Sequence, residues 1–167
     1  MKNILLIAWL ATTLSLTAQN KAIKSAEVTF EFVAKGVDGT IAGFTSASTI
    51  DFDNLQNSVF KGAVAVETLD TDNGLRNWSL KGRKYFNEDS YPKISFESTT
   101  ITQKDDTYKV QGTLTLKGTK KPLTITFTKN GNTLVGKASL YTSDFGINIK
   151  KKREDNLVKI TFRFVLS

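Results

Sequence analysis

The chain has 167 residues, a length typical of one ordinary domain, and a formal net charge of +7 at pH 7. It contains no histidine and no cysteine. These absences exclude disulfides, the usual zinc and transition-metal sites, and serine–histidine or cysteine–histidine catalysis. We therefore expect no metal site, no cofactor and no enzyme, and a fold stabilised by its hydrophobic core alone.

The first 18 residues have the pattern of a secretory signal peptide. Lys2 supplies a positive charge, an apolar run extends from Ile4 to Leu16, and cleavage is expected after Ala18. The apolar run is too short for a comfortable membrane span. The sequence predicts a signal peptide at residues 1–18, one mature domain at residues 19–167, and a soluble periplasmic protein.

Alternation of apolar and polar residues predicts three strands before residue 70. The first covers residues 27–32 and ends at turn residues 35–39, the second covers residues 40–52, and the third covers residues 59–68. One face of each strand is apolar and the other is polar, which is typical of strands that are half buried.

The alternation stops between residues 71 and 96. Large apolar residues recur within this interval roughly three to five positions apart, at Leu75, Trp78, Leu80 and Tyr85. This spacing predicts a short helix with one apolar face. A helical insert in a chain of strands is expected to close or cover one end of a barrel.

Strands resume after the insert. They are expected over residues 94–101, 108–116, 123–127, 134–142 and 158–164, with a loop at residues 117–122 and a tight Asn-Gly hairpin at residues 129–132. About eight or nine strands at hairpin spacing predict an all-β fold, namely an antiparallel eight-stranded barrel with one short helical insert. The interior of such a barrel is just wide enough to be filled by side chains or to hold one ligand.

Apolar residues of the inward faces and of the insert are candidates for the wall of a cavity. They could equally fill an ordinary core, because protein interiors are usually close-packed. Inward glycines such as Gly62, Gly112 and Gly136 favour a cavity because they leave volume. The candidates are Phe30, Phe32, Phe44, Phe52, Phe60, Val64, Trp78, Leu80, Phe86, Phe96, Tyr108, Leu114, Ile125, Phe127 and Phe162.

A basic run in the insert suggests a binding site for a phosphate head group. Arg76 is the best candidate, because a guanidinium group can bind phosphate through two hydrogen bonds. The alternative is a solvated helix face. Nucleic acid is not an expected partner, since no nucleic-acid-binding motif is present and the protein is predicted to be exported.

Several ordered motifs resemble the signatures of YceI-like proteins. The resemblance rests on residues 71–76, 85–86 and 91–96, on the Gly-Thr-Leu-Thr-Leu-Lys-Gly stretch at residues 112–118, and on the Asp-Phe-Gly motif at residues 144–146. It extends from about residue 28 to residue 164. The chain departs from the family where Asn77 and Ser79 replace the usual aspartate and histidine.

The resemblance implies an exported, lipocalin-like barrel with an elongated apolar cavity that binds an isoprenoid lipid, either an isoprenoid quinone or a polyprenyl phosphate, for carriage, storage or sequestration. It implies no shared catalytic chemistry, and a homodimer is left open. The alternative is a small outer-membrane or solid-core barrel with a structural or interaction role and no ligand. Polar outward residues such as Glu31 and Lys109 argue against the outer-membrane form, which needs an apolar outer band.

Overall fold

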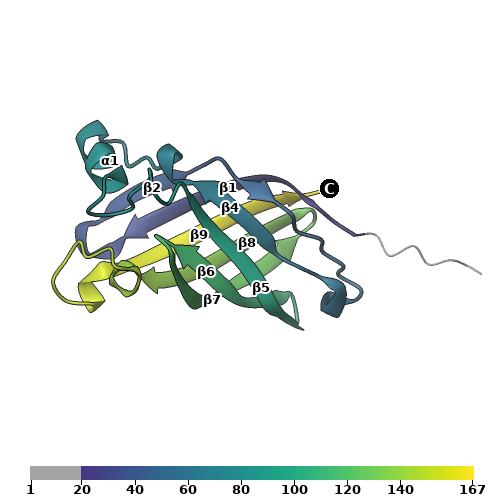
Figure 1. The fold of residues 1–167 in the computed structure, drawn as a ribbon. Coiled ribbons are helices and arrows are strands. Elements are labelled where there is room, and N and C mark those ends of the chain that lie inside the picture. Colours follow the sequence, from purple (N-terminus) through teal and green to yellow (C-terminus); the bar gives the residue numbers. More distant parts are fainter. Residues whose placement is uncertain (1–19) are drawn as a thin grey trace, which may run out of the picture.

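The computed structural model describes residues 20–167, so the predicted signal peptide lies outside the described residues. Nine strands form one antiparallel sheet in the order β2-β1-β9-β8-β7-β6-β5-β4-β3 (Figure 1). They are β1 (Ile23–Phe32), β2 (Val37–Ile41), β3 (Thr45–Ser46), β4 (Lys61–Ala65), β5 (Lys93–Lys104), β6 (Thr107–Leu116), β7 (Thr119–Asn130), β8 (Thr133–Tyr141) and β9 (Leu157–Leu166). The all-β antiparallel prediction is confirmed, and the ninth strand is the two-residue β3.

One α-helix, α1 (Gly74–Lys81), and five 3-10 turns connect these strands in the described part of the chain. The turns are η1 (Val33–Lys35), η2 (Leu55–Asn57), η3 (Val66–Thr68), η4 (Thr142–Phe145) and η5 (Glu154–Asn156). The side chain of Asn73 accepts a hydrogen bond from the backbone N–H of Arg76 and thereby caps the start of α1. The predicted helical insert is therefore confirmed over eight residues.

The sheet curls until its two edges approach each other, and isolated hydrogen bonds join them. The backbone N–H of Thr40 donates to the carbonyl of Asp70 at 2.8 Å, and Asp70 returns a bond to Thr40 at 3.0 Å. The N–H of Ala65 donates to the carbonyl of Ala42 at 3.0 Å. The edge strands thus meet without a continuous ladder between them.

The predicted loop at residues 117–122 is wrong, because β6 and β7 are joined by a two-residue turn. Leu116 pairs with Thr119, and the turn residues Lys117 and Gly118 have φ angles of 49° and 73°. Positive φ at both central residues is what a tight hairpin needs. A lysine gives no sequence signal for this conformation, so the turn was not recognised.

Strands β7 and β8 diverge toward the end of the barrel that contains this turn. They pair only from Thr126 and Lys137 to Asn130 and Thr133, so the first half of β7 has no partner on β8. The segment after β8 lies near both strands, and its Phe145 is buried. This divergence widens the barrel at one end.

Two polar groups hold the widening segment, residues 142–156, in place. Arg153 donates to both carboxylate oxygens of Asp144, at 2.7 and 2.6 Å, and its guanidinium lies 3.8 Å from the centre of the Tyr141 ring. Asn156 is fully buried; its side chain accepts from two backbone N–H groups and donates to two carbonyls between residues 149 and 152. Both lone pairs of the amide oxygen and both N–H groups of the amide nitrogen are therefore used.

An aromatic cluster fills the middle of the barrel. We define it as Phe44, Phe60, Phe127, Phe162 and Phe164, whose ring centroids lie 5.2 to 6.2 Å apart in five pairs. Phe127 is the central ring and is completely buried. Offset and tilted rings at these separations are the favoured geometry for aromatic packing.

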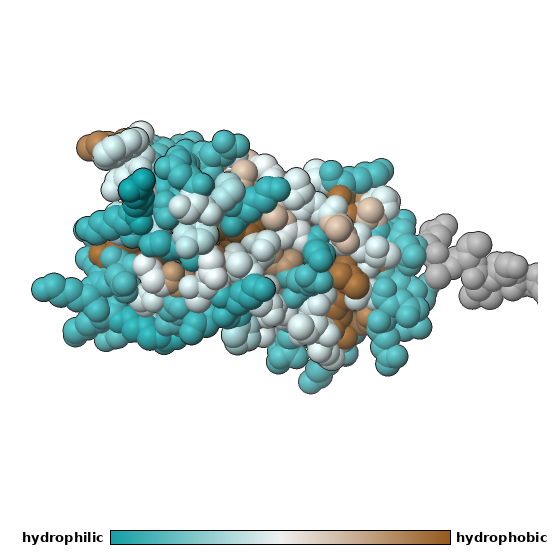
Figure 2. All heavy atoms as spheres, in the orientation of Figure 1, coloured by the Kyte–Doolittle hydropathy of each residue, from teal (hydrophilic) through white to brown (hydrophobic). Residues whose placement is uncertain are grey.

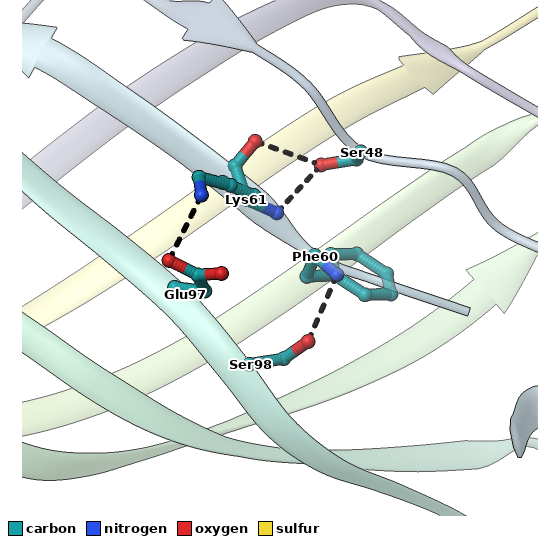
Figure 3. A network of polar contacts seen from close by, with 5 residues as sticks. All are labelled: Ser48, Phe60, Lys61, Glu97 and Ser98. Atoms are coloured by element: carbon teal, nitrogen blue, oxygen red, sulfur yellow. Dashed lines mark hydrogen bonds and ion pairs between the residues drawn. The ribbon is translucent and has the colours of Figure 1, made fainter. Parts of the chain in front are cut away.

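Phe60 belongs to this cluster and is fixed by its backbone. Its N–H donates to the Ser98 hydroxyl at 2.9 Å (Figure 3). Its carbonyl accepts from the Ser98 N–H at 2.8 Å. The next residue, Lys61, exchanges backbone hydrogen bonds with the Ser48 hydroxyl and forms an ion pair with Glu97 at 3.0 Å. These contacts tie the β3–β4 edge to β5 and orient the Phe60 ring inward.

Candidate functional site

The barrel encloses a cavity of about 570 Å³ with a predominantly apolar wall. Twelve of the fifteen predicted wall residues line it: Phe30, Phe32, Phe44, Phe60, Val64, Leu80, Phe86, Phe96, Leu114, Ile125, Phe127 and Phe162. The exposed residues Lys35 and Leu75 also belong to the wall, so the cavity opens to solvent at the end of the barrel that carries α1. We call this end the mouth.

Phe52 and Tyr108 do not line the cavity. Their rings pack edge to face at 5.4 Å, and the Lys129 ammonium lies 5.1 Å from the Phe52 ring centre. The sequence predicted one continuous strand over residues 40–52, but β2 ends at Ile41 and only β3 continues the ladder. A break of this kind removes the two-residue period that assigned Phe52 to the inner face.

Trp78 does not line the cavity either, and its side chain is 76% exposed. The predicted apolar face of the helix is wrong, because Leu75 is also exposed while Leu80 packs inward. Residues three apart share a helix face, whereas residues two or five apart do not. Leu75 and Trp78 therefore face one way, and Leu80 faces another.

The inward glycines do not leave empty volume. A Cβ atom on Gly136 would overlap the Phe127 ring, and one on Gly112 would overlap the Phe96 ring. Gly62 and Gly39 have the same relation to the rings of Phe44 and Phe30. Each glycine thus gives room to a phenylalanine of a neighbouring segment, and the interpretation of these glycines as cavity volume is wrong.

Sequence reasoning missed part of the wall. Leu140 and Val158 pair across β8 and β9 on the inner face, so their alternation with polar neighbours could have identified them. Ile149 and Leu69 lie outside the strands, in segments without a period, and no sequence signal marks them. The other large apolar wall residues that were not singled out are Ile23, Val28, Val37, Ile41, Leu75, Tyr85, Ile94, Leu123 and Phe164.

Polar wall residues gather at the mouth around Arg76. Its Nε donates to the Thr71 hydroxyl at 2.8 Å, and its Nη2 donates to the Thr71 carbonyl at 2.6 Å. These two bonds use two of the five N–H groups of the guanidinium. Arg76, Thr71 and Ser79 all belong to the cavity wall. The predicted head-group candidate therefore lies at the cavity, and Thr71 orients it.

Asn77 connects α1 to the preceding segment. Its carbonyl oxygen accepts from the Thr71 N–H at 2.9 Å and from the Thr71 hydroxyl at 2.6 Å, and its amide nitrogen donates to Asp70 at 2.7 Å. This last bond lowers the pKa of the Asp70 carboxyl. The amide therefore donates a bond to Asp70 that an ionised aspartate at position 77 could not provide, since a carboxylate only accepts.

The Thr142 side chain is the one wall hydroxyl in residues 20–167 that is buried without a hydrogen-bond partner. It is 4% exposed and lies at the start of η4, beside the cavity. An unpaired buried hydroxyl costs free energy unless a ligand or water supplies a partner. Thr142 is thus a candidate contact for a polar group of a bound molecule.

Residues 20–167 contain no group of acidic side chains arranged to hold a metal ion. Within the same residues, no helix combines the length and the apolar character required to cross a bilayer.

Comparison with known proteins identifies the family. The chain matches the YceI-like domain over residues 18–166. The chain belongs to the YceI-like family. The signature segments noted in the sequence lie on α1 and its flanking residues, on the start of β5, on the β6–β7 hairpin and at η4. Those around α1, on β5 and on the hairpin contribute residues to the cavity wall.

Similar curated proteins are themselves described only by a family label. A UPF0312 protein of Photorhabdus laumondii is 33% identical over 85 residues, which is 51% of this chain and 44% of that protein. A UPF0312 protein of Yersinia pestis is 31% identical over 87 residues, which is 52% of this chain and 45% of that protein. The chain thus matches less than half the length of these relatives.

Solved structures share the fold at low sequence identity. BcnA of Burkholderia cenocepacia has a TM-score of 0.74 at 21% identity, covering 85% of this chain and 96% of that one. A polyisoprenoid binding domain from Saccharophagus degradans, implicated in plant cell wall breakdown, has a TM-score of 0.59 at 9% identity, covering 89% and 97%. At these identities the likeness establishes the fold.

Proposed function

We propose that this YceI-like protein is an exported, periplasmic binding protein that holds an isoprenoid lipid in the barrel cavity, without catalysis. The observation that carries this proposal is the cavity itself, whose volume of about 570 Å³ lies among those of ligand pockets, roughly 300–1,000 Å³. Its wall is built from phenylalanine and aliphatic side chains. Such a wall recognises an apolar chain by contact area rather than by directed bonds.

The distribution of polar groups supports a ligand with one polar end. Arg76, Thr142 and Lys35 lie at the mouth, whereas the aromatic cluster lies inside the barrel. An isoprenoid quinone or a polyprenyl phosphate has this chemistry, and the likeness of the fold to a polyisoprenoid binding domain agrees with it. Apolar burial contributes about 25 cal/mol per Å², so a long prenyl chain would supply most of the binding free energy.

The proposal is tested by placing a large side chain on the inner face of β9, where it would fill part of the cavity. Ile160 lines the cavity, whereas Val165 lies on the outer face of the same strand and is 38% exposed. We expect Ile160→Trp to weaken binding of an isoprenoid quinone at least tenfold, with Val165→Trp as the matched control. Binding is measured by ligand-induced thermal stabilisation and by native mass spectrometry of protein purified from its own host.

The proposal fails if the purified protein carries no lipid mass and neither quinones nor polyprenyl phosphates raise its melting temperature. Equal binding by Ile160→Trp and Val165→Trp would place any bound lipid outside the cavity.

The head-group role of Arg76 has its own test. A charge-assisted hydrogen bond contributes about 1.5–3 kcal/mol, so we expect Arg76→Ala to weaken a polyprenyl phosphate roughly tenfold or more. The neutral quinone should lose little, because it carries no phosphate. Arg83→Ala is the control, since Arg83 is exposed and outside the cavity wall. Equal losses for both ligands would mean that Arg76 acts only by holding Thr71.

A further inference from the structure

The outer face of α1 exposes two large apolar side chains. Leu75 is 78% exposed and Trp78 is 76% exposed, about twice the exposure of any other large exposed hydrophobic in residues 20–167. The two residues are three apart, so they share one helix face. Figure 2 shows hydrophobic atoms projecting at the α1 corner, with hydrophilic residues around them.

This face belongs to the mouth of the cavity. The opposite side of the same helix contributes Arg76 and Leu80 to the cavity wall, and Leu75 lies at its rim. A surface that contacts Leu75 and Trp78 would therefore lie next to the opening. The exposure of these residues has no explanation in the packing of the barrel itself.

The loops around the mouth are held together as one surface. The Lys117 ammonium donates to the carbonyl of Lys84 at 3.2 Å and to the carbonyl of Gly146 at 3.3 Å. It thus connects the β6–β7 turn, the segment after α1 and residues 142–156. Lys35 of η1 lies at the same cavity opening, and η1 contacts η5 (Figure 1).

The net positive charge of the domain is concentrated on this surface. Segments 33–36, 70–92, 117–121 and 142–156 contain twelve lysines and arginines and seven acidic residues. The rest of residues 20–167 contains ten basic and nine acidic residues, so it is almost neutral. A charge imbalance confined to one end gives that end an attraction for anionic surfaces.

We propose that the mouth is a docking face for an anionic lipid bilayer. Tryptophan favours the membrane–water interface, and a short helix with exposed apolar residues among basic ones is typical of interfacial binding. The surrounding lysines attract anionic head groups. Leu75 and Trp78 enter the interface, and the cavity opening then faces the lipid. The docking stands on its own geometry, while its use for lipid exchange rests on the proposed function.

Insertion of Trp78 is tested by fluorescence. The protein is purified from an exporting host, and Trp9→Phe is introduced so that Trp78 is the only tryptophan. Vesicles contain phosphatidylglycerol and phosphatidylcholine brominated in the acyl chains. We expect the brominated lipid to quench at least half of the fluorescence, and pure phosphatidylcholine to give much less quenching. Absence of quenching with anionic vesicles would overturn the proposal.

Paired variants test which surface docks. Leu75→Ser with Trp78→Ser should weaken vesicle binding at least tenfold, whereas Val59→Ser with Val165→Ser, the exposed apolar control, should change it less than twofold. Lys120→Glu with Lys121→Glu should weaken it more than Lys104→Glu with Lys109→Glu, which reverses equal charge away from the mouth. Docking through the mouth would be contradicted if the two serine variants weakened vesicle binding equally, or if the two glutamate variants did.

Two further outcomes separate the alternatives. If Leu75 and Trp78 instead form a dimer contact, light scattering will show a dimer that the double serine variant dissociates, and vesicles will not bind. This result would overturn the proposal.

Docking is also separable from ligand binding. The cavity-blocked Ile160→Trp protein should still bind vesicles. The single variant Trp78→Ser, which changes no residue of the cavity wall, should keep its affinity for lipid in detergent but exchange lipid with vesicles more slowly. Docking and ligand binding can therefore fail independently.

Discussion

The aromatic cluster and the mouth both border the cavity, yet the side chains of the cluster pack closely against one another and the mouth is open to solvent. In the cluster, Phe127 is surrounded by rings from other segments and is completely buried. At the mouth, β7 and β8 separate, and irregular segments replace ladder partners in the wall. Both regions have apolar inner faces. The difference shows that backbone spacing, rather than the number of apolar residues, decides where a barrel is empty.

Truncating one phenylalanine in each region gives the largest expected contrast. Phe127→Ala removes a completely buried ring that packs against three other rings of the cluster, and it should cost about 3–5 kcal/mol of the free energy of unfolding. Phe30→Ala removes a half-buried ring that already borders the cavity. Because fewer contacts are lost, it should cost roughly 2 kcal/mol or less. Chemical denaturation measures both. Similar costs would mean that the mouth is packed as tightly as the cluster.

Gly136, which lies against the Phe127 ring, tests the same difference in packing with a smaller substitution. Gly136→Ala places a methyl group against a ring that cannot move aside, so we expect a loss of about 1–3 kcal/mol. Gly74→Ala on α1 meets no atom within 4 Å and should change stability by about 1 kcal/mol or less, in the stabilising direction. Thermal unfolding of the two variants checks this. A neutral Gly136→Ala would show that the aromatic cluster can relax.

The smallest effect is expected from the Asp144–Arg153 pair at the mouth. The Arg153 guanidinium lowers the pKa of the Asp144 carboxyl, chiefly through their hydrogen bonds. A lowered folded-state pKa contributes stability above the unfolded pKa of about 3.9, and this contribution is lost as the pH falls through the folded value. Asp144→Asn should therefore reduce stability slightly near pH 7, and this difference should become smaller near pH 3, below the unfolded-state pKa.

Hydrogen exchange of residues 142–156, measured at both pH values, separates this local effect from general acid unfolding. Faster exchange of this segment in Asp144→Asn at pH 7 is expected, while exchange in the aromatic cluster stays unchanged. A change in the cluster instead would indicate that the pair supports the whole barrel.

Much of the site could be predicted wherever a residue lies in a regular strand. Phe30, Phe96 and Ile125 were assigned to the inner face by alternation, and the cavity wall contains them. The assignment failed for Phe52, which follows a break in the chain, and for Trp78, where two helix faces were merged into one. Thr142 ends the predicted strand 134–142 and has the same parity as Leu140, so alternation could have assigned it to the inner face. Ile149 could not be found, because residues outside periodic elements carry no facing signal.

The sequence by itself determined most of the strands, the helical insert and the absence of histidine and cysteine chemistry, because these depend on local pattern and composition. Only the tertiary structure decided that a cavity exists. Its wall combines residues from strands around the whole barrel with residues from irregular segments, and the space beside the glycines that suggested open volume is occupied by rings from neighbouring segments. Whether an interior is full depends on distances between segments far apart in the chain, and no local pattern specifies those distances.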